Sequence, residues 1–449
     1  MENLNDNLNE TKRQTVGCLQ RFSKSIKAVI IAFLVLLLLI PMFMIENLIS
    51  ERERTQKDAI AEVGQKWSLA QTVTGPYINL EYPLTYEENG ITKVSKGNVF
   101  LFPDELSVDG QLNTEILRRG IYKVNVYKSE LLIKGYFSSE ELRKSNVDRN
   151  LLEYNKAAIC LNLTDMRGLS EQVSIRLNDS VYVFESGMDE RGIDNMGVHA
   201  IVDLSALKGD KKLPYEMRIK LKGSQSISFT PLGKVTKVNL KGNWNSPSFD
   251  GNYLPEKREI TGKDFSAQWK VLNLNRNYSQ VIVKDKNDSI SDIKNSNFGV
   301  NLKMPVDQYQ QSTRSIKYAV LIVLLTFTVI FFTEIMGKAR IHALQYLLVG
   351  LALILFYSLQ LSMSEHIGFN MAYLVASILT IALVGGYMLG VVKKQKSAFT
   401  MVGLLGILYA YVFILIQLET YALLAGSLGL FVILATVMYF SKKIDWFNE

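Results

Sequence analysis

Paired carboxylates are the residues in this chain whose chemistry comes closest to catalysis. Asp165, Asp189, Glu190, Asp250 and Glu256 all lie in the polar middle part of the sequence. Two carboxyl groups at a suitable separation are enough to hydrolyse a glycosidic bond. Turns and surfaces account for such residues in most domains of this size, so we expect no catalytic dyad. A carbohydrate- or peptidoglycan-active enzyme remains the alternative.

Other catalytic and metal-binding patterns are missing from the sequence. It contains no G-x-S-x-G elbow, P-loop, H-E-x-x-H or C-x-x-C motif. Three histidines (His199, His342 and His366) and two cysteines (Cys18 and Cys160) are too few for a His-rich metal centre or a disulfide framework. We interpret His199 as a packed histidine. The sequence therefore predicts no catalytic residue, no metal and no cofactor.

A segment rich in aromatic residues, 229–255, is the best candidate for ligand binding. It sets Trp244, Phe249 and Tyr253 among prolines and glycines, including Pro247. Aromatic faces can stack on sugars and cations at low entropic cost. Our hypothesis for a binding site is that these four residues contact a ligand. We favour over it a long loop whose rings fill a small core of their own.

Six apolar segments are long enough to cross a bilayer as helices. The first, 28–45, is followed by Glu46, Asn47 and Leu48 rather than by the small residues of a signal-peptide cleavage site, so we predict an uncleaved anchor. The other five follow one another near the C-terminus, at about 316–336, 343–363, 367–392, 399–418 and 423–440.

Lysines and arginines flank alternate ends of these segments. They precede the first span and follow the second, fourth and sixth, whereas the other short connections carry Glu365 with His366, and Glu419. Basic residues mark the cytoplasmic side. We therefore predict a multi-pass protein of the bacterial inner membrane with both termini in the cytoplasm. These flanks also explain the net charge of +7 without a nucleic-acid-binding face.

The predicted organisation has five parts. They are a cytoplasmic tail at 1–27, a transmembrane helix at 28–45, a periplasmic β-rich domain with a helical stalk at 46–315, a five-helix transmembrane domain at 316–441 and a cytoplasmic tail at 442–449. The central part, about 270 residues, can bury its own core. Alternation such as Val-Thr-Lys-Val-Asn-Leu at 235–240 predicts a mostly antiparallel β-sandwich, although the strand order cannot be read.

Four ionisable residues of the membrane part are candidates for contacts. Glu334 lies toward the cytoplasmic end of the second span, where Lys338 is a possible partner four residues on. Glu365, His366 and Glu419 fall at external ends of spans, where they could contact the periplasmic domain or sense pH. A proton-driven transporter should carry more charge at midplane depth. A membrane subunit of a transport or signalling complex remains an alternative.

Several short motifs occur in an order that resembles one known family. They include QTVTGP at 71–76, RRGIYKV at 118–124, LTDMRGL at 163–169, FTPLG at 229–233, PSFDG at 247–251, PVDQY at 305–309, SMSEH at 362–366 and QLETYALLAG at 417–426. This sequence resembles the CreD family of bacterial inner-membrane proteins, also called cell envelope integrity proteins. It differs at 340–343, where Arg-Ile-His-Ala stands in place of a His-Pro pair.

The resemblance implies a role in envelope maintenance, with expression tied to a two-component stress system and phenotypes in colicin tolerance and β-lactam response. It supplies no catalytic residue and no cofactor. We therefore predict a non-enzymatic envelope integrity protein whose partners are the lipid bilayer and, through its β domain, an envelope or cell-wall component bound in a stress response.

Overall fold

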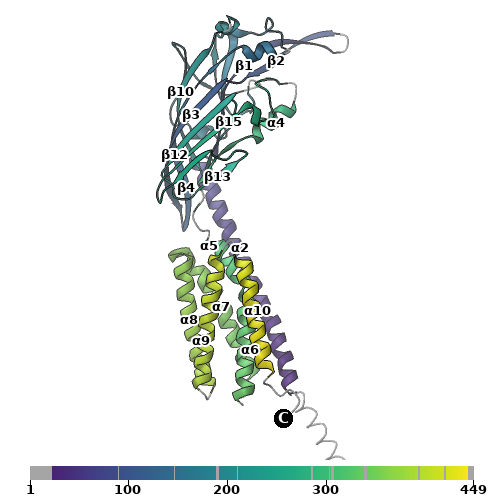
Figure 1. Ribbon diagram of the computed structural model, residues 1–449, viewed down its shortest axis with the longest axis vertical. Coiled ribbons are helices and arrows are strands. Elements are labelled where there is room, and N and C mark those ends of the chain that lie inside the picture. The colour runs from purple at the N-terminus through teal and green to yellow at the C-terminus, as the bar shows by residue number, and fades with distance from the viewer. Residues whose placement is uncertain are drawn as a thin grey trace, which may run out of the picture. The chain divides into compact units, whose positions relative to one another are not determined.

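The chain forms two compact units, seen in Figure 1. The structure is a computed structural model that describes residues 23–442, except 89–90, 146, 189–191, 210, 285–286, 303, 305–307, 338–340, 393–394 and 419–420. One unit combines residues up to Thr55 with those from Val306 onward, and the other is Gln56–Pro305. We call them the membrane unit and the β domain.

The membrane unit is built from long apolar helices. They are α2 (Ser23–Trp67), α5 (Gln308–Lys317), α6 (Ala319–Gly337), α7 (Ala343–Ile367), α8 (Phe369–Val391), α9 (Gln395–Gln417) and α10 (Ala422–Ser441). Within the described residues, six helical segments are long and apolar enough to cross a membrane, with α5 and α6 contributing to one of them. One segment lies near the N-terminus and five in the C-terminal part, which confirms the predicted arrangement.

The two units divide at slightly different places from those the sequence predicts. Helix α2 runs without a break from the apolar segment to Trp67, and its last residues, from Gln56, belong to the β domain. Helix α5, placed by prediction almost wholly outside the membrane part, packs in the membrane unit. Its buried face carries Tyr309, Ser312 and Ser315, and Ser312 accepts a hydrogen bond from Gln360 of α7 at 3.1 Å. Hydropathy misses this helix because its buried face is polar.

The β domain contains two sheets. The first has the order β13 (Pro247–Gly251), β17 (Phe298–Leu302), β11 (Ser226–Phe229), β1 (Gln71–Glu88), β5 (Ala157–Leu163), β9 (Gly197–Val202) and β8 (Glu185–Ser186), and β1 also pairs with β2 (Ile91–Leu101), which pairs with β16 (Val281–Val283). The second has the order β14 (Lys257–Ile260), β15 (Phe265–Leu272), β12 (Val235–Gly242), β3 (Glu105–Arg119), β4 (Tyr122–Phe137), β10 (Leu213–Ser224), β6 (Ser174–Leu177) and β7 (Ser180–Val183).

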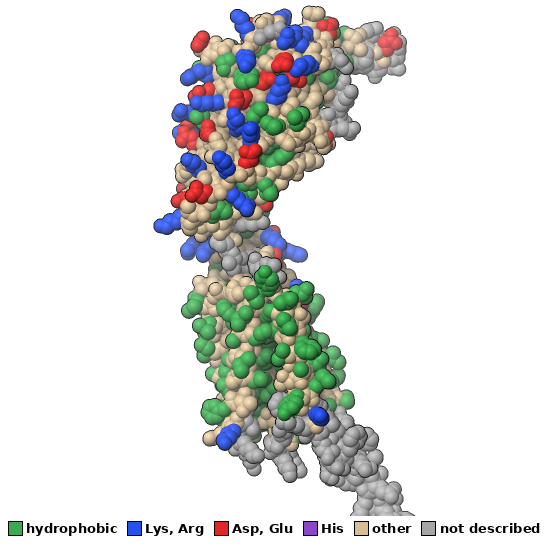
Figure 2. All heavy atoms as spheres, viewed as in Figure 1, with side chains coloured by type: hydrophobic (Ala, Val, Ile, Leu, Met, Phe, Trp, Pro, Cys, Tyr) green, Lys and Arg blue, Asp and Glu red, His purple; other side chains and the backbone are tan. Residues whose placement is uncertain are grey.

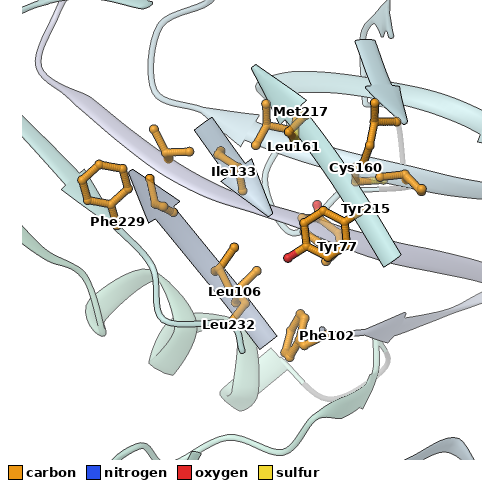
Figure 3. Packing of buried hydrophobic residues seen from close by; sticks show 14 of the residues in the cluster. Tyr77, Phe102, Leu106, Ile133, Cys160, Leu161, Tyr215, Met217, Phe229 and Leu232 are labelled. Carbon is orange, nitrogen blue, oxygen red and sulfur yellow. The ribbon is translucent and has the colours of Figure 1, made fainter. Parts of the chain in front are cut away.

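Most of these strand pairs are antiparallel, as predicted, and two are parallel, β1 with β11 and β3 with β12. Alternation explains the burial: in β12, Val238 and Leu240 are buried while Lys237 and Lys241 face solvent. The inward side chains of both sheets form one continuous hydrophobic cluster, part of which is shown in Figure 3. The short helices α3 (Glu140–Lys144) and α4 (Asn287–Asn295) lie in connections between strands.

Candidate functional site

A groove of about 280 Å³ opens on the outer face of the first sheet, within the β domain. Strands β1, β5 and β11 supply its floor. The loop that precedes β9 forms one wall, and α4 with the residues after it forms the other. The described lining residues are Thr72, Thr74, Asn162, Leu163, Thr164, Ile193, Asp194, Met196, Thr230, Ile293, Lys294 and Asn297.

Threonine hydroxyls dominate the floor of this groove. In β1, Val73 points into the core, so Thr72 and Thr74 on either side of it point outward. The Thr74 and Thr230 hydroxyl oxygens lie 2.6 Å apart in a hydrogen bond. The hydroxyl of Thr164 accepts the backbone N–H of Thr72 at 3.0 Å. A hydroxyl can both donate and accept, so this floor suits a neutral ligand rich in hydroxyl or amide groups.

A buried hydrogen-bond chain fixes the first wall. Tyr77 donates from its hydroxyl to Asn162 Oδ1 at 2.6 Å and accepts the N–H of Ile193 at 2.8 Å. The amide nitrogen of Asn162 donates to the carbonyls of Asp194 at 2.8 Å and Met196 at 2.7 Å. Burial raises the pKa of Tyr77 well above its ordinary value, which keeps the hydroxyl protonated as a donor. The wall is therefore set before any ligand arrives.

The Tyr77 ring belongs at the same time to the hydrophobic core, where Figure 3 shows it beside Cys160 and near Phe102. Its ring lies edge-on to Phe102, with centroids 6.2 Å apart. One residue thus anchors the groove wall to the packed interior. A substitution of Tyr77 should therefore alter the groove wall, although the Tyr77 side chain does not line the groove.

The rim of the groove carries an ion pair. Lys294 of α4 lies 3.0 Å from the carboxylate of Asp194 in the opposite wall, and both side chains are about half exposed. Such a surface pair adds little to stability. Its effect here is on charge, because each residue neutralises the other at the groove mouth.

The strands under the groove have no free edges at this point. Strand β1 pairs with β11 on one side and β5 on the other, and β5 pairs with β1 and β9. Their backbone N–H and C=O groups are therefore engaged in the sheet. A ligand on this face would be recognised by side chains rather than by strand addition.

Among the carboxylates that the structure describes, Asp165 and Asp250 are not brought together. Asp165 follows β5 and Asp250 lies in β13, and three strands separate them in the sheet, a distance of about 19 Å at ~4.8 Å per strand. Glycosidase carboxyls lie about 5–10 Å apart. Glu256 is exposed, and Asp250 accepts a hydrogen bond from Ser248 at 3.1 Å. Asp189 and Glu190 lie outside the described residues.

Asp165 has a structural role at the junction of α2 and the first sheet. Its carboxylate accepts the N–H of Leu69 at 3.0 Å, the N–H of Arg167 at 3.1 Å and the Arg167 guanidinium at 2.9 Å. Burial alone would raise the pKa of Asp165, but these hydrogen bonds outweigh it and lower the pKa below its usual value. His199, in β9, is mostly buried and its Nδ1 lies 2.5 Å from the carbonyl of Gly187, as a packed histidine would.

The four residues predicted to bind a ligand lie in and beside β13, and their rings pack inward. Trp244 is 7 % exposed. Phe249 lies edge-on to Trp269, with centroids 5.7 Å apart, and the Tyr253 ring lies edge-on to Phe298 at 5.8 Å. Pro247 begins the strand. These contacts match the favoured interpretation of rings that fill a core, and a ligand contact at this segment stays a prediction.

The membrane-part candidates make contacts inside the membrane unit. Glu334 forms an ion pair with Lys27 of α2 and accepts hydrogen bonds from the Tyr346 hydroxyl at 3.0 Å and the Ile341 N–H at 3.1 Å. Its sequence-predicted partner Lys338 lies outside the described residues.

At the opposite end of α7, the Glu365 carboxylate accepts the Tyr309 hydroxyl at 3.0 Å and lies 3.9 Å from the Arg52 guanidinium. His366 is exposed, and Glu419 lies outside the described residues. Glu334 and Glu365 therefore connect α2, α5, α6 and α7. Whether any of these four residues contacts a partner stays a prediction.

The groove threonines were missed because they come from three distant parts of the chain. One signal was present: Thr72 and Thr74 alternate with Val73 in a strand pattern, and each of the motifs at 71–76, 163–169 and 229–233 contains at least one of the four threonines. Nothing in the sequence says that these motifs meet. The pairing of β5 and β11 with β1 brings them together.

The comparison with known proteins agrees with this architecture. A family model described as "Inner membrane protein CreD" matches residues 23–447. The chain belongs to the CreD family. The inner membrane protein CreD of Escherichia coli (strain K12) is 32 % identical over 422 residues, which cover 92 % of this chain and 91 % of that protein. The CreD match covers both the β domain and the six helical segments of the described residues that can cross a membrane, so this chain belongs to a family of inner-membrane proteins.

Proposed function

We propose that this CreD protein is a non-enzymatic receptor of the cell envelope, whose β domain binds a neutral, hydroxyl-rich glycan of the envelope or cell wall. The floor of four threonine side chains between walls held by the Tyr77–Asn162 hydrogen bonds carries the proposal. Its walls are preformed, which lowers the entropic cost of binding. Binding would link the state of the envelope to a stress response.

The charges of the groove favour a neutral ligand over a phosphate. Lys294, the cation among its described lining residues, is already paired with Asp194. The paired edges of β1 and β5 also disfavour an extended peptide, because peptides that add to a sheet need an unpaired strand. Side-chain hydroxyls and an amide are left as the recognition groups. They match sugar hydroxyl and acetamido groups.

The arrangement in the membrane follows from the basic residues. Lys and Arg flank the first span on its N-terminal side, and Lys396 follows the fourth span. Under the positive-inside rule both termini are cytoplasmic and the β domain is periplasmic. The groove would then face the compartment that contains the cell wall.

The test is binding of soluble cell-wall disaccharides to the full chain in nanodiscs, measured by calorimetry. Thr74→Val with Thr230→Val removes both partners of one hydrogen-bonded pair, so the fold should tolerate it. With about 1 kcal/mol for each lost ligand hydrogen bond, the double variant should bind about 30-fold more weakly.

Thr85→Val is the matched control, since Thr85 is an exposed threonine of the same strand, β1. It should bind like the unaltered chain. Unchanged affinity in the double variant, or binding of stem peptides in preference to disaccharides, would contradict the proposal. Release of reducing sugar from the disaccharides would favour the enzymatic alternative instead.

A further inference from the structure

The hairpin of β3 and β4 ends in a tip, residues 113–123, that combines aliphatic and basic side chains. Arg119 of β3 pairs directly with Tyr122 of β4, so Gly120 and Ile121 form a two-residue turn. Gly120 has a φ of +59°, which glycine adopts without strain. Figure 1 shows β3 and β4 side by side along the β domain.

The tip extends past the buried part of β3. Leu112 is fully buried, whereas the β3 side chains from Asn113 to Arg119 are half-buried or exposed. Ile116 is 49 % exposed and Ile121 40 % exposed. Two large aliphatic side chains close to one turn are therefore exposed to solvent.

The tip also carries three exposed basic side chains, Arg118, Arg119 and Lys123, and one exposed carboxylate, Glu115, which is paired with Lys128 at 3.1 Å. Arg118 and Lys123 are exposed and stand directly opposite each other in the register of β3 and β4. Like charges at opposed positions destabilise a hairpin. Within the described residues, neither Arg118 nor Lys123 has an acidic partner, whereas Arg119 forms a two-point ion pair with Glu62, at 2.8 and 3.2 Å.

The direction of the hairpin is given by its contacts with α2. Lys128, which pairs with Asn113 at the start of the tip, lies over the ring of Trp67, 5.7 Å from the centroid, and Arg119, next to the turn, binds Glu62. The tip therefore points toward lower residue numbers of α2. In that direction along the sequence the chain reaches its bilayer-spanning segment, 28–45.

We propose that this hairpin tip docks on the anionic phospholipid surface of the bilayer in which the chain is anchored. Lipid phosphates would neutralise Arg118 and Lys123, and Ile116 and Ile121 would contact the boundary between headgroups and acyl chains. Tyr122, half-buried beside the turn, is a residue type enriched at membrane interfaces. An acidic protein would satisfy the charges but not the exposed isoleucines.

Covalent attachment makes a weak contact sufficient. The described part of the same chain has six helical segments that can cross a membrane, so the tip would meet the bilayer at an effective concentration set by the tether rather than by diffusion from solution. Each basic residue near an anionic surface contributes about a factor of five. Arg118 and Lys123 together should change the ratio of docked to undocked tips by about 30-fold.

The experiment places an environment-sensitive fluorophore at Ile121→Cys in a Cys18→Ser background of the full chain, with Cys160 left in place because it is buried. The protein is reconstituted into nanodiscs of phosphatidylcholine alone or with phosphatidylglycerol, and spin-labelled lipids serve as quenchers. We expect quenching with phosphatidylglycerol that weakens at high salt and is lost in Arg118→Gln with Lys123→Gln. The same probe at Val94→Cys, an exposed position in β2, should not respond.

Thermal unfolding of the Gln variants should match that of the unaltered chain, since both side chains are exposed and have no acidic partner among the described residues. Equal quenching at positions 94 and 121, or quenching at 121 that ignores lipid charge and salt, would overturn the proposal. Quenching that rises with nanodisc concentration would assign the tip to a second copy of the chain, and would overturn it as well.

Discussion

Replacing Tyr77 by phenylalanine tests whether the groove wall depends on the interior of the β domain. The substitution keeps the ring and its contact with Phe102 but removes a hydroxyl that donates to Asn162 and accepts from Ile193. Both partners are at least 95 % buried, so two polar groups lose their partner away from water. At about 1–2 kcal/mol for each, we expect a loss of about 2–4 kcal/mol.

Tryptophan fluorescence gives a suitable assay, because Trp67, Trp244 and Trp269 all belong to the β domain and the chain has four tryptophans. For a domain of this size, 1 kcal/mol shifts the melting temperature by about 2–4 °C, so a decrease of about 5–15 °C is expected. Tyr182→Phe, at a half-buried tyrosine of edge strand β7, is the control and should melt within about 2 °C of the unaltered chain.

A double-mutant cycle decides the mechanism. If Tyr77 acts through Asn162, then Asn162→Ala in the Tyr77→Phe background should cost less than Asn162→Ala alone, because the two residues form one hydrogen-bond chain. Strictly additive losses, or an unchanged melting temperature in Tyr77→Phe, would refute the reasoning. Weaker glycan binding in Tyr77→Phe would connect the buried hydroxyl with the proposed function.

Three further predictions concern residues that sequence inspection singled out. The folded pKa of Asp165 lies below its unfolded value near 3.9, so its stabilising effect is complete above that value and is lost as the pH falls through the folded pKa. Melting temperatures measured between pH 6 and pH 2 should therefore fall with pH, and Asp165→Asn should make this decrease smaller. Glu334→Ala leaves the Tyr346 hydroxyl and the Ile341 N–H without an acceptor and should destabilise the membrane unit by about 2–4 kcal/mol, measured as helix unfolding by circular dichroism. The control Glu46→Ala, at an exposed position of α2, should leave the stability unchanged. Phe249→Ala should destabilise the β domain by about 3 kcal/mol, since its ring packs on Trp269 and Phe265, whereas a residue serving ligand binding alone would lose affinity without a change in melting temperature.

Local patterns predicted the elements of this fold well. The uninterrupted apolar run before Glu46 has no other stable place than a bilayer, so the span is readable from residue type alone. The alternation at 235–240 appears as β12, with Val238 and Leu240 inward. Hydropathy missed helix α5 because it measures transfer into lipid, whereas the buried Ser312 of this helix bonds to Gln360 and to the carbonyl of Gln308.

Long-range pairing was beyond sequence reasoning. Glu334 forms an ion pair with Lys27, which lies 307 residues away and which the sequence did not suggest as a partner. Strand β1 pairs in parallel with β11, so that Thr72 stands opposite Ser228. Such contacts depend on how whole faces of sheets and helices pack together. A short stretch of neighbouring residues carries no information about that packing. The packing of the aromatic segment could not be predicted for the same reason, because Phe265 and Trp269, the partners of Phe249, lie in β15.

The size of the groove limits what kind of recognition it can provide. At about 280 Å³ it lies near the lower end of small-molecule sites, so it can enclose only a short part of an envelope polymer. Hydroxyl contacts exchange one set of hydrogen bonds for those with water, and each gives only about 1 kcal/mol. A weak site suits a protein held in the bilayer next to a repetitive polymer, since many anchored copies can bind along one strand and their avidity grows with the density of exposed units. Occupancy would then report how much of the glycan is accessible rather than whether the glycan is present. Accessibility is the quantity that changes when an envelope is damaged.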